Sequence, residues 1–369
     1  MKTFKKVLSI LLVAAMCFAL ASCSMVDDTD ITKDNIKIGV VLPGQVDGDD
    51  DYVPDLATLQ TLTAVNGAAS IGAGLSSDRF QYQENIDPSN EEAVRSAVHT
   101  LINRECTMIF LADSGYMDAV EKYLSGDAAD GDVSATDTKV QFIIYNGRDN
   151  GKNIHSYSAD ISGAVYLSGV VAGLKAKELK MPKIGYLLKD GKDFTLLNAF
   201  ALGAQSVYSE VKLDARVCTD IKADCQALIA AGNAVIASDF YADSLAESCE
   251  DVFFCGFGSD RHSDSEKFLC APIYDYSQYY LNTVFEVIDY DDVEYDENGD
   301  EIDKSGALPN IPVYEGSYAN GAVYISQLGD ACAEGTKTAM DAAEAAVLSG
   351  TVALDNLSAA PIAGVTLAK

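Results

Sequence analysis

The sequence has no tryptophan and few histidines. Its three histidines, His99, His155 and His262, lie far apart along the 369 residues. It has nine cysteines, but no two of them form a Cys-x-x-Cys pair. Structural zinc sites are usually built from such clusters. The composition therefore argues against a zinc site, and no metal site or cofactor is predicted.

Motifs of nucleotide-dependent and hydrolytic enzymes are also missing or incomplete. Residues 185–192 (GYLLKDGK) resemble a phosphate loop, but five residues separate the glycines and Asp193 follows the lysine. In a phosphate loop four residues separate the two glycines, and a serine or threonine that binds magnesium follows the lysine. Gly256-Phe257-Gly258 begins a dinucleotide fingerprint, but Arg261 stands at its third glycine. There is no GxSxG or HExxH motif. Missing motifs do not by themselves exclude catalysis, but nothing in the sequence requires it, and we expect a protein that is not an enzyme.

Positive charge is scarce as well. The chain has 26 lysines and arginines against 56 aspartates and glutamates, a formal net charge of −30. Such a surface repels phosphate backbones, so nucleic acid is not a predicted partner.

The first residues have the order of a lipoprotein leader. Lysines precede an apolar run at residues 7–20, which is too short for a membrane span and has the length of a signal-peptide core. Leu20-Ala21-Ser22-Cys23 then resembles the lipobox of bacterial lipoproteins, in which the cysteine is acylated. We expect a signal peptide at 1–22, a lipidated Cys23 and a polar tether at 23–35, which would anchor the protein at the extracytoplasmic face of the cell membrane. The alternative is an ordinary signal peptide in which Cys23 lies near the cleavage site by chance.

Seven cysteines remain after Cys17 and Cys23, an odd number, so at least one thiol stays free or pairs between chains. We expect unpaired, buried thiols, since a free cysteine behaves as a small hydrophobic residue. A Cys218–Cys225 or a Cys249–Cys255 disulfide is the alternative.

From Ile36 onward, short β-rich runs alternate with longer helical patterns, which is typical of parallel sheets with crossover helices. Ser89 and Glu92 have the spacing of a capping box at one helix start. The predicted strands are residues 36–42, 80–84, 107–111, 140–145, 184–188, 212–218, 234–237 and 252–256. The predicted helices are 56–71, 89–103, 116–124, 160–179, 194–208 and 225–231, with a short one near Ser244.

The alternation runs twice, which predicts an α/β protein of two doubly wound parallel-sheet lobes joined by a hinge. We expect the first lobe to hold residues 36–147 and 271–310, and the second 148–270 and 311–369. Residues 289–304 interrupt the pattern, and Asn298-Gly299 predicts a β-hairpin with a type I′ turn. The acidic spacing there is similar to a calcium loop, but Glu301 stands at the turn glycine and Ala307 at the bidentate glutamate. An acidic surface hairpin is the better interpretation.

Aromatic and carboxylate residues follow several predicted strands. In open sheets of this type, ligands bind beyond the carboxyl ends of the strands. An aromatic ring offers a flat apolar face, and a carboxylate accepts hydrogen bonds from hydroxyl groups. The alternative for each residue is a helix cap or a place in the core. The candidate ligand-binding residues are Asp51, Tyr52, Ser114, Tyr116, Phe194, Asp239, Phe240 and Asp260.

The central part of the chain resembles the basic membrane protein family of solute-binding lipoproteins, which includes purine-nucleoside receptors of ABC importers. The resemblance is carried by residues 166–177 (YLSGVVAGLKAK), 183–186 (KIGY) and 198–208 (NAFALGAQSVY), with weaker matches at 38–42, 256–260 and 316–324. It implies a type I periplasmic-binding-protein fold that captures a small polar ligand, nucleoside-like, for ABC permease subunits.

The same resemblance implies two ligand contacts. Asp260 matches the family aspartate that contacts sugar hydroxyls, and Tyr52 matches its aromatic residue near the first strand. Val53 stands where the family often has an asparagine, and Gly163-Ala164 where it often has an acidic residue. Two other functions stay open: a nucleoside-processing enzyme on the same scaffold, and a lipid-anchored ligand sensor.

Overall fold

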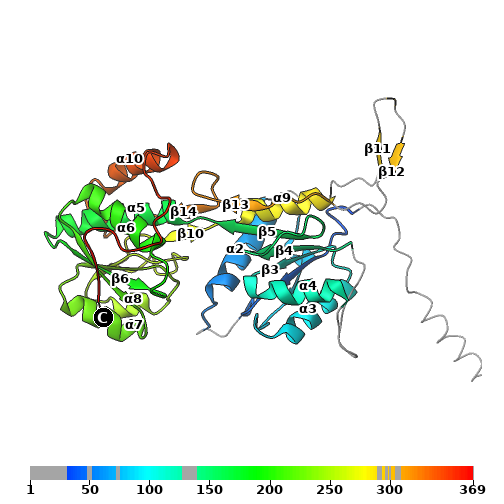
Figure 1. Cartoon of the computed structure of the whole chain (residues 1–369), viewed down its shortest axis with the longest axis horizontal. Coiled ribbons are helices and arrows are strands. Elements are labelled where there is room, and N and C mark those ends of the chain that lie inside the picture. Colours follow the sequence, from blue (N-terminus) through cyan, green and yellow to red (C-terminus); the bar gives the residue numbers. More distant parts are fainter. Residues whose placement is uncertain are drawn as a thin grey trace, which may run out of the picture.

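The computed structural model describes residues 31–47, 52–71, 75–126, 139–288, 293–295, 298, 301–303 and 309–368. Two α/β lobes lie side by side along the long axis of the molecule, each built around its own sheet (Figure 1). The predicted signal peptide, the lipidation site Cys23 and most of the tether lie outside the described residues.

The sheet of the first lobe has six strands, all parallel, in the order β13-β5-β4-β3-β1-β2. Every residue of β1 and β3 is buried, because helices cover both faces of the sheet. The strands are β1 (Ile38–Val41), β2 (Phe80–Gln83), β3 (Met108–Leu111), β4 (Gln141–Tyr145), β5 (Ile154–Ala159) and β13 (Tyr314–Gly316).

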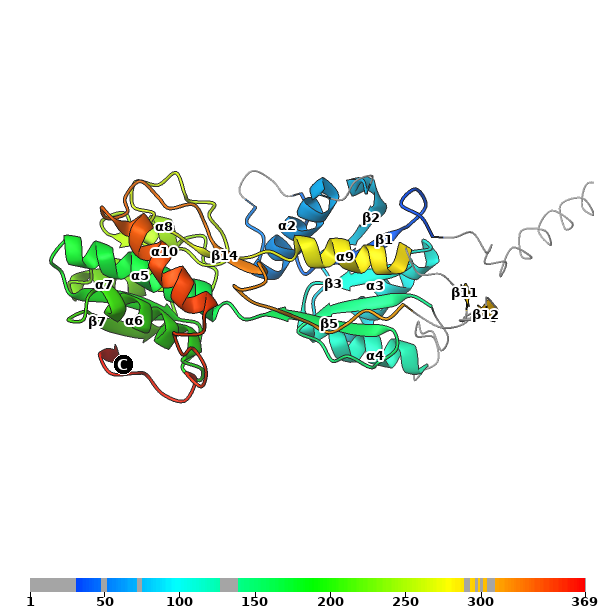
Figure 2. The ribbon, with the colours of Figure 1, turned by 90° about the horizontal axis from the view of Figure 1, so that it is seen from above.

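Two helices lie on each face of this sheet. On one face, α2 (Leu56–Ile71) and α9 (Ser277–Ile288) pack against each other and against β1 residues such as Val40 (Figure 2). On the other face, α3 (Glu91–Asn103) and α4 (Met117–Ser125) bury Val41 and Ile109. Short 3-10 turns η1 (Ser77–Arg79) and η2 (Ser114–Tyr116) precede β2 and α4.

The predicted capping box of α3 is wrong. The Asn90 side chain accepts the Ala93 N–H at 3.2 Å, whereas the Ser89 hydroxyl donates to the Asp87 carboxylate at 2.7 Å. The helix therefore begins one residue later than the box requires, because an Asx turn at Asp87 occupies Ser89.

The second lobe has a five-stranded parallel sheet in the order β15-β7-β6-β8-β9. Its strands are β6 (Lys183–Leu188), β7 (Lys212–Val217), β8 (Val235–Ser238), β9 (Phe253–Phe254) and β15 (Val365–Leu367). Its helices are α5 (Ser162–Glu178), α6 (Thr195–Val207), α7 (Ile221–Ala230), α8 (Leu245–Ser248) and α10 (Thr336–Leu348).

Helices α5 and α6 approach each other closely through glycine. A Cβ atom on Gly169 would overlap the Phe200 carbonyl oxygen, and one on Gly203 would overlap the Tyr166 carbonyl oxygen. The two backbones are therefore in direct contact, and any side chain at these positions would separate them.

The chain crosses between the lobes three times. It passes from β5 directly into α5, from β10 (Pro272–Tyr274) into α9, and from β13 into β14 (Val323–Ile325), which pairs with β10 in an antiparallel ribbon. The predicted two-lobed α/β architecture is confirmed.

The predicted boundaries between the lobes are displaced by one strand on each side. The sequence places β5 and β13 in the second lobe, but β5 pairs with β4, and β13 pairs with β5, in the sheet of the first lobe. The first crossing therefore lies at about residue 160 and not at 148. The sequence misses β5 because His155 and two serines interrupt its apolar pattern.

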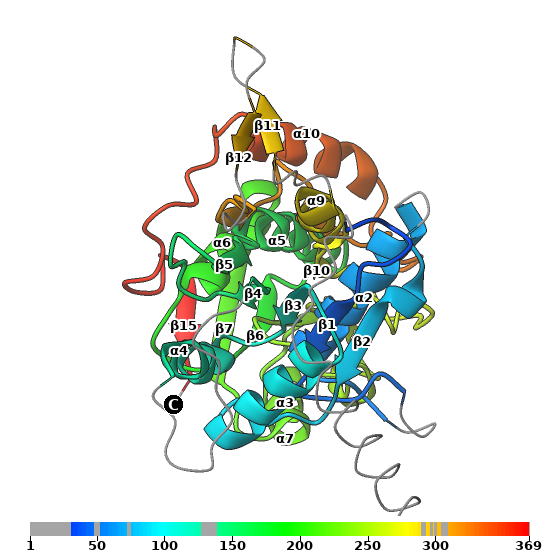
Figure 3. The same ribbon diagram turned by 90° about the vertical axis from the view of Figure 1, so that its right-hand side faces the viewer.

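The predicted acidic hairpin is present. Strands β11 (Val293–Tyr295) and β12 (Glu301–Asp303) pair antiparallel and project from the first lobe (Figures 1 and 3).

Among the described residues, no helix is long and apolar enough to cross a membrane.

Candidate functional site

The carboxyl ends of both sheets face the opposite lobe. In the first lobe, β5 ends at Ala159 and the chain enters the second lobe two residues later. In the second lobe, the loop after β9 reaches the first lobe, since a Cβ on Gly258 would overlap the Leu56 side chain at the start of α2. The strand ends therefore form two opposed edges, which is where a ligand binds in sheets of this kind.

Tyr52 lies at the first-lobe edge, in the loop after β1. It is half-buried, and its hydroxyl accepts the Gln45 N–H at 2.7 Å. The neighbouring Asp55 carboxylate accepts the Thr58 N–H at 2.9 Å and the Thr58 hydroxyl at 2.7 Å, which caps α2. These bonds hold the loop in place. The adjacent candidate Asp51 lies outside the described residues.

Two candidate ligand-binding residues follow β3: Ser114, which is accessible to solvent, and Tyr116, which is not. Ser114 is exposed and follows Asp113, whose carboxylate accepts the Gly115 N–H at 2.7 Å. Tyr116 is fully buried, and its hydroxyl donates to the Ile86 carbonyl at 2.8 Å. The prediction that Tyr116 contacts a ligand is therefore wrong, because its ring fills the core between the sheet, α3 and α4.

Asp239 lies at the second-lobe edge, directly after β8. It is half-buried, and its carboxylate accepts the Lys189 N–H at 2.7 Å. Burial raises the pKa of Asp239 to about 6, and the negative charge of Asp190 adds to this, while the hydrogen bonds from the backbone oppose it. At neutral pH this carboxylate is thus mostly charged, and it takes up its proton as the pH falls through about 6.

The two phenylalanine candidates of this lobe are largely covered. Phe194 precedes α6 and is only 9% exposed, and its N–H donates to the Ser358 carbonyl at 3.3 Å. Phe240 is half-buried and packs against the cluster around Leu187 and Leu245. Both rings contribute mainly to the core of the lobe.

Asp260 is exposed, in the loop after β9. Its backbone carbonyl accepts the Ser263 N–H at 2.8 Å, so the turn is closed by the main chain and not by the carboxylate. The nearby basic side chains pair with Asp243, whose carboxylate lies 3.0 Å from His262 Nε2 and 3.8 Å from Arg261 Nε. The negative charge of Asp260 instead reaches Tyr324, whose pKa is raised mainly by burial and further by Asp260 and Asp275.

A group of tyrosines between the lobes was not predicted as part of the site. Tyr145 ends β4 and meets Tyr276 edge to face at 6.2 Å between ring centroids, and Tyr276 stacks on Tyr274 at 6.0 Å. Phe257 of the β9 loop lies 6.4 Å from Tyr274. The repeat of tyrosine in residues 274–280 (YDYSQYY) is the sequence signal that could have indicated this group.

The family comparison decides the identity of the chain. The profile of the Bmp family, described as ABC transporter substrate-binding protein PnrA-like, matches residues 36–224. The chain belongs to the Bmp family. No curated protein sequence matches it significantly.

Solved structures agree with this Bmp-family fold. The chain is similar to an ABC transporter solute-binding protein from Conexibacter woesei, with a TM-score of 0.61 and 12% identity over 88% of this chain and 99% of that one. It is similar to a transcriptional activator of the comK gene from Bacillus halodurans (TM-score 0.61, 14% identity, 86% and 99% covered). It is also similar to a solute-binding protein from Aeropyrum pernix (TM-score 0.56, 13% identity, 86% and 92% covered). The predicted type I periplasmic-binding-protein fold is confirmed.

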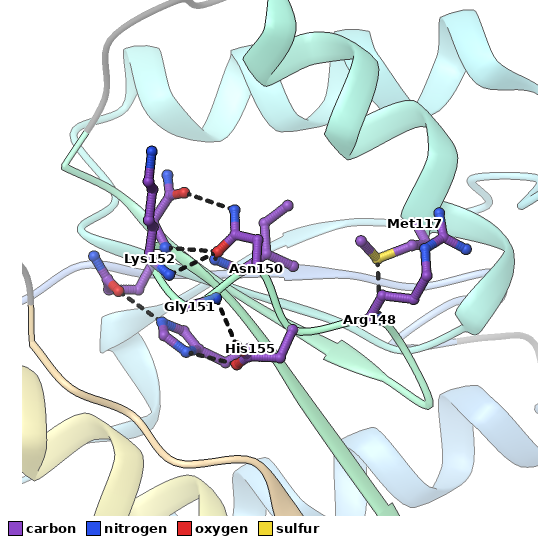
Figure 4. A network of polar contacts seen from close by, with 10 residues as sticks. Met117, Arg148, Asn150, Gly151, Lys152 and His155 are labelled. Carbon is purple, nitrogen blue, oxygen red and sulfur yellow. Dashed lines mark hydrogen bonds and ion pairs between the residues drawn. The ribbon is translucent and has the colours of Figure 1, made fainter.

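The Bmp-family chain has one pocket away from the opposed edges and another beside a crossing between the lobes. One, of about 350 Å³, is lined by residues 149–155 and 309–311, at the amino end of β5. There the Asn150 side chain accepts three N–H groups of its own loop, and His155 Nε2 lies 2.8 Å from Gln141 (Figure 4). Burial lowers the pKa of His155 although Asp149 is near. The other pocket, of about 380 Å³, lies between α10 and residues 318–328.

Family and fold thus identify a substrate-binding protein of an ABC transporter, with a small-molecule ligand and permease subunits as partners. This family and this fold are those of substrate-binding proteins and not of enzymes. Within the described part of the chain, no group of three or more acidic, histidine or cysteine side chains could hold a metal ion.

Proposed function

We propose that this Bmp-family protein is anchored by a lipid at Cys23 and captures a nucleoside-like ligand between its lobes for delivery to a membrane permease. The family and the two opposed edges support the capture role. Closing of the lobes over the ligand would be driven by the difference in affinity between the closed and open forms.

The charge of the two edges supports a ligand that carries no phosphate. Carboxylates follow four strands, namely Asp113, Asp160, Asp239 and Asp260 after β3, β5, β8 and β9. Carboxylates accept hydrogen bonds from hydroxyl and amino groups and repel phosphate oxygens. A sugar with free hydroxyls meets this requirement.

Aromatic rings at the same edges support a planar group in the ligand. Tyr52 and Tyr145 are half-buried at the ends of β1 and β4, and each therefore keeps part of its surface accessible. A ring of this kind offers a flat apolar face to a base. A planar base joined to a hydroxyl-bearing sugar is the chemistry of a nucleoside.

Calorimetric titration tests the ligand class. A nucleoside should bind with one site per chain, and its 5′-monophosphate should bind at least tenfold more weakly, a difference of about 1.4 kcal/mol or more. Equal or tighter binding of the monophosphate would contradict the proposal. An exposed surface aspartate variant, Asp251→Asn, is the matched control and should bind the nucleoside as the parent does.

Membrane fractionation tests the anchor. Cys23→Ser should release the protein from membranes, because the acyl chains attach through this sulfur. Cys17→Ser, a cysteine change inside the apolar leader, is the matched control and should leave the protein in the membrane fraction. If Cys23→Ser also stays there, the anchor lies elsewhere in the chain.

A further inference from the structure

Six of the seven described cysteines lie in the second lobe, in two separate groups. Cys218, Cys225 and Cys249 lie around α7 and α8, and Cys255, Cys270 and Cys332 lie around the loop after β9. The seventh, Cys106, is buried in the first lobe just before β3. Each group contains one pair of cysteines whose sulfur atoms lie within 4.0 Å of each other.

The first group contains a closely spaced pair that joins two helices. Cys225 lies in α7, Cys249 directly follows α8, and their sulfur atoms are 3.9 Å apart. Both residues are 0% exposed and are enclosed by Leu187, Leu228 and Leu245. The Cys249 thiol donates to the Cys225 sulfur, and this lowers the pKa of Cys225. The two sulfurs thus face each other with no side chain between them.

The second group contains an equivalent pair held by the main chain. The sulfur atoms of Cys255 and Cys270 are 4.0 Å apart, and both residues are 0% exposed. The Gly256 N–H donates to the Cys270 carbonyl at 2.9 Å, and the Leu269 N–H donates to the Phe254 carbonyl at 2.9 Å. Hydrogen bonds on both sides of the pair therefore fix the two segments next to each other.

We propose that Cys225–Cys249 and Cys255–Cys270 are disulfide-forming pairs that crosslink the second lobe when the chain folds in an oxidising environment. A disulfide has a sulfur–sulfur distance of about 2.05 Å. Rotation of the two side chains must therefore bring each pair together by roughly 2 Å. In the structure the seven described cysteines are free thiols, the state that the sequence predicted. Neither pair is among the alternative disulfides that the sequence suggested, because pairing follows the fold and not the spacing along the chain.

The chemistry needs an oxidant, which is a small-molecule disulfide such as oxidised glutathione. For each pair, two S–H bonds break and one S–S bond forms, while two electrons and two protons pass to the oxidant, which is cleaved to two thiols. Since all four protein sulfurs are buried, the oxidant reaches them while the chain folds. The crosslinks close loops of 24 and 15 residues, which restricts the unfolded chain.

Refolding followed by thiol mapping tests this proposal. The full chain is unfolded in urea with reductant and refolded in a mixture of reduced and oxidised glutathione. Free thiols are then alkylated before peptide mass spectrometry. The expected products are linked peptides containing Cys225–Cys249 and Cys255–Cys270, with Cys106 alkylated. Relative to the chain refolded with reductant alone, we expect the oxidised chain to melt roughly 5–10 °C higher.

Two variants sharpen the result. Cys225→Ser should remove the first crosslink, keep the second and lose part of the rise in melting temperature. The matched control Cys106→Ser should keep both crosslinks and the full rise. Alkylation of all four paired cysteines, or linkage of Cys218–Cys225 or Cys249–Cys255 instead, would overturn the proposal. Mapping of the unmutated chain decides this even if Cys225→Ser does not fold. Because the oxidant is supplied in vitro, the outcome is independent of the ligand and of the membrane anchor.

Discussion

At the scale of single residues, the sequence pattern indicated where strands end, but it did not indicate which side chains after them are accessible and which are buried. Tyr52 and Tyr116 both follow a strand and both have a hydroxyl, yet Tyr52 is half-buried at the edge and Tyr116 is buried in the core. The difference arises because η2 turns the Tyr116 ring back under the sheet toward Ile86. A contact of this kind depends on tertiary packing, which residue type and spacing do not encode.

Asp260→Ala should weaken binding of a ribose-bearing ligand at least tenfold, or about 1.4 kcal/mol. A carboxylate that accepts hydroxyl hydrogen bonds contributes roughly 1.5–3 kcal/mol for each charge-assisted bond. The carboxylate of Asp260 does not close the turn at Ser263, so the melting temperature should hardly change. Titration calorimetry and a thermal melt of the same variant measure both quantities. Asp264→Ala, an exposed carboxylate in the same loop, is the control. Unchanged affinity with a lower melting temperature would assign Asp260 a structural role only.

Asp239→Asn should stabilise the protein at pH 7 by on the order of 1–2 kcal/mol and leave its stability unchanged near pH 4. Burial raises the pKa of Asp239 to about 6 in the folded protein, against about 3.9 in an unfolded chain. The folded state therefore binds the proton more tightly, and the parent loses stability as the pH rises from about 4 to 6. Asparagine has no charge to bury, and its side-chain oxygen can still accept the Lys189 N–H.

Urea unfolding of the parent and of Asp239→Asn at several pH values between 4 and 7 measures this difference. Asp251→Asn, which changes an exposed carboxylate, should run parallel to the parent throughout. A constant offset between Asp239→Asn and the parent at all pH values would show that the charge of Asp239 is not the cause.

At the scale of secondary-structure elements, the sequence predicted most strands and helices to within a few residues. Strands such as 184–188 are continuous apolar runs, which buried parallel strands require. The failures have local causes. Strand β5 is interrupted by polar residues, of which His155 places its Nε2 2.8 Å from Gln141 on the neighbouring β4. Since that partner lies fourteen residues away, the sequence pattern alone gave no reason to expect a strand.

Gly203→Ala should destabilise the second lobe by roughly 2–4 kcal/mol, because the new methyl group would overlap the Tyr166 carbonyl oxygen and force α5 and α6 apart. Alanine otherwise favours a helix over glycine, so intrinsic helix propensity predicts the opposite sign. Urea unfolding decides between the two. Gly191→Ala, where the added Cβ would lie 3.2 Å from a Val217 methyl group in an exposed loop, is the control and should change stability by less than about 1 kcal/mol. A stabilised Gly203→Ala protein would mean that the helices are not in backbone contact.

At the scale of the whole molecule, two lobes and three crossings bring the carboxyl ends of both sheets to opposed edges, and carboxylates follow strands of both sheets. The sequence predicted the two lobes, since the alternation of strands and helices runs twice. The tyrosine-rich run 274–280 is a signal for the tyrosine group at the crossings, but the sequence does not show that Tyr145 joins it, because Tyr145 and Tyr276 are far apart along the chain and meet only when the chain returns to the first lobe. The candidate site therefore depends on the assembled lobes and not on any one motif.

The central claim is that the protein binds a nucleoside-like solute and returns it unchanged, and native mass spectrometry tests it most directly. The full chain is incubated for hours with a mixture of nucleosides and their 5′-monophosphates, and the bound and released molecules are weighed. We expect one intact nucleoside per chain and no monophosphate, with the same nucleoside mass after release. Release of a free base and sugar, or retention of a monophosphate in preference to its nucleoside, would contradict the account.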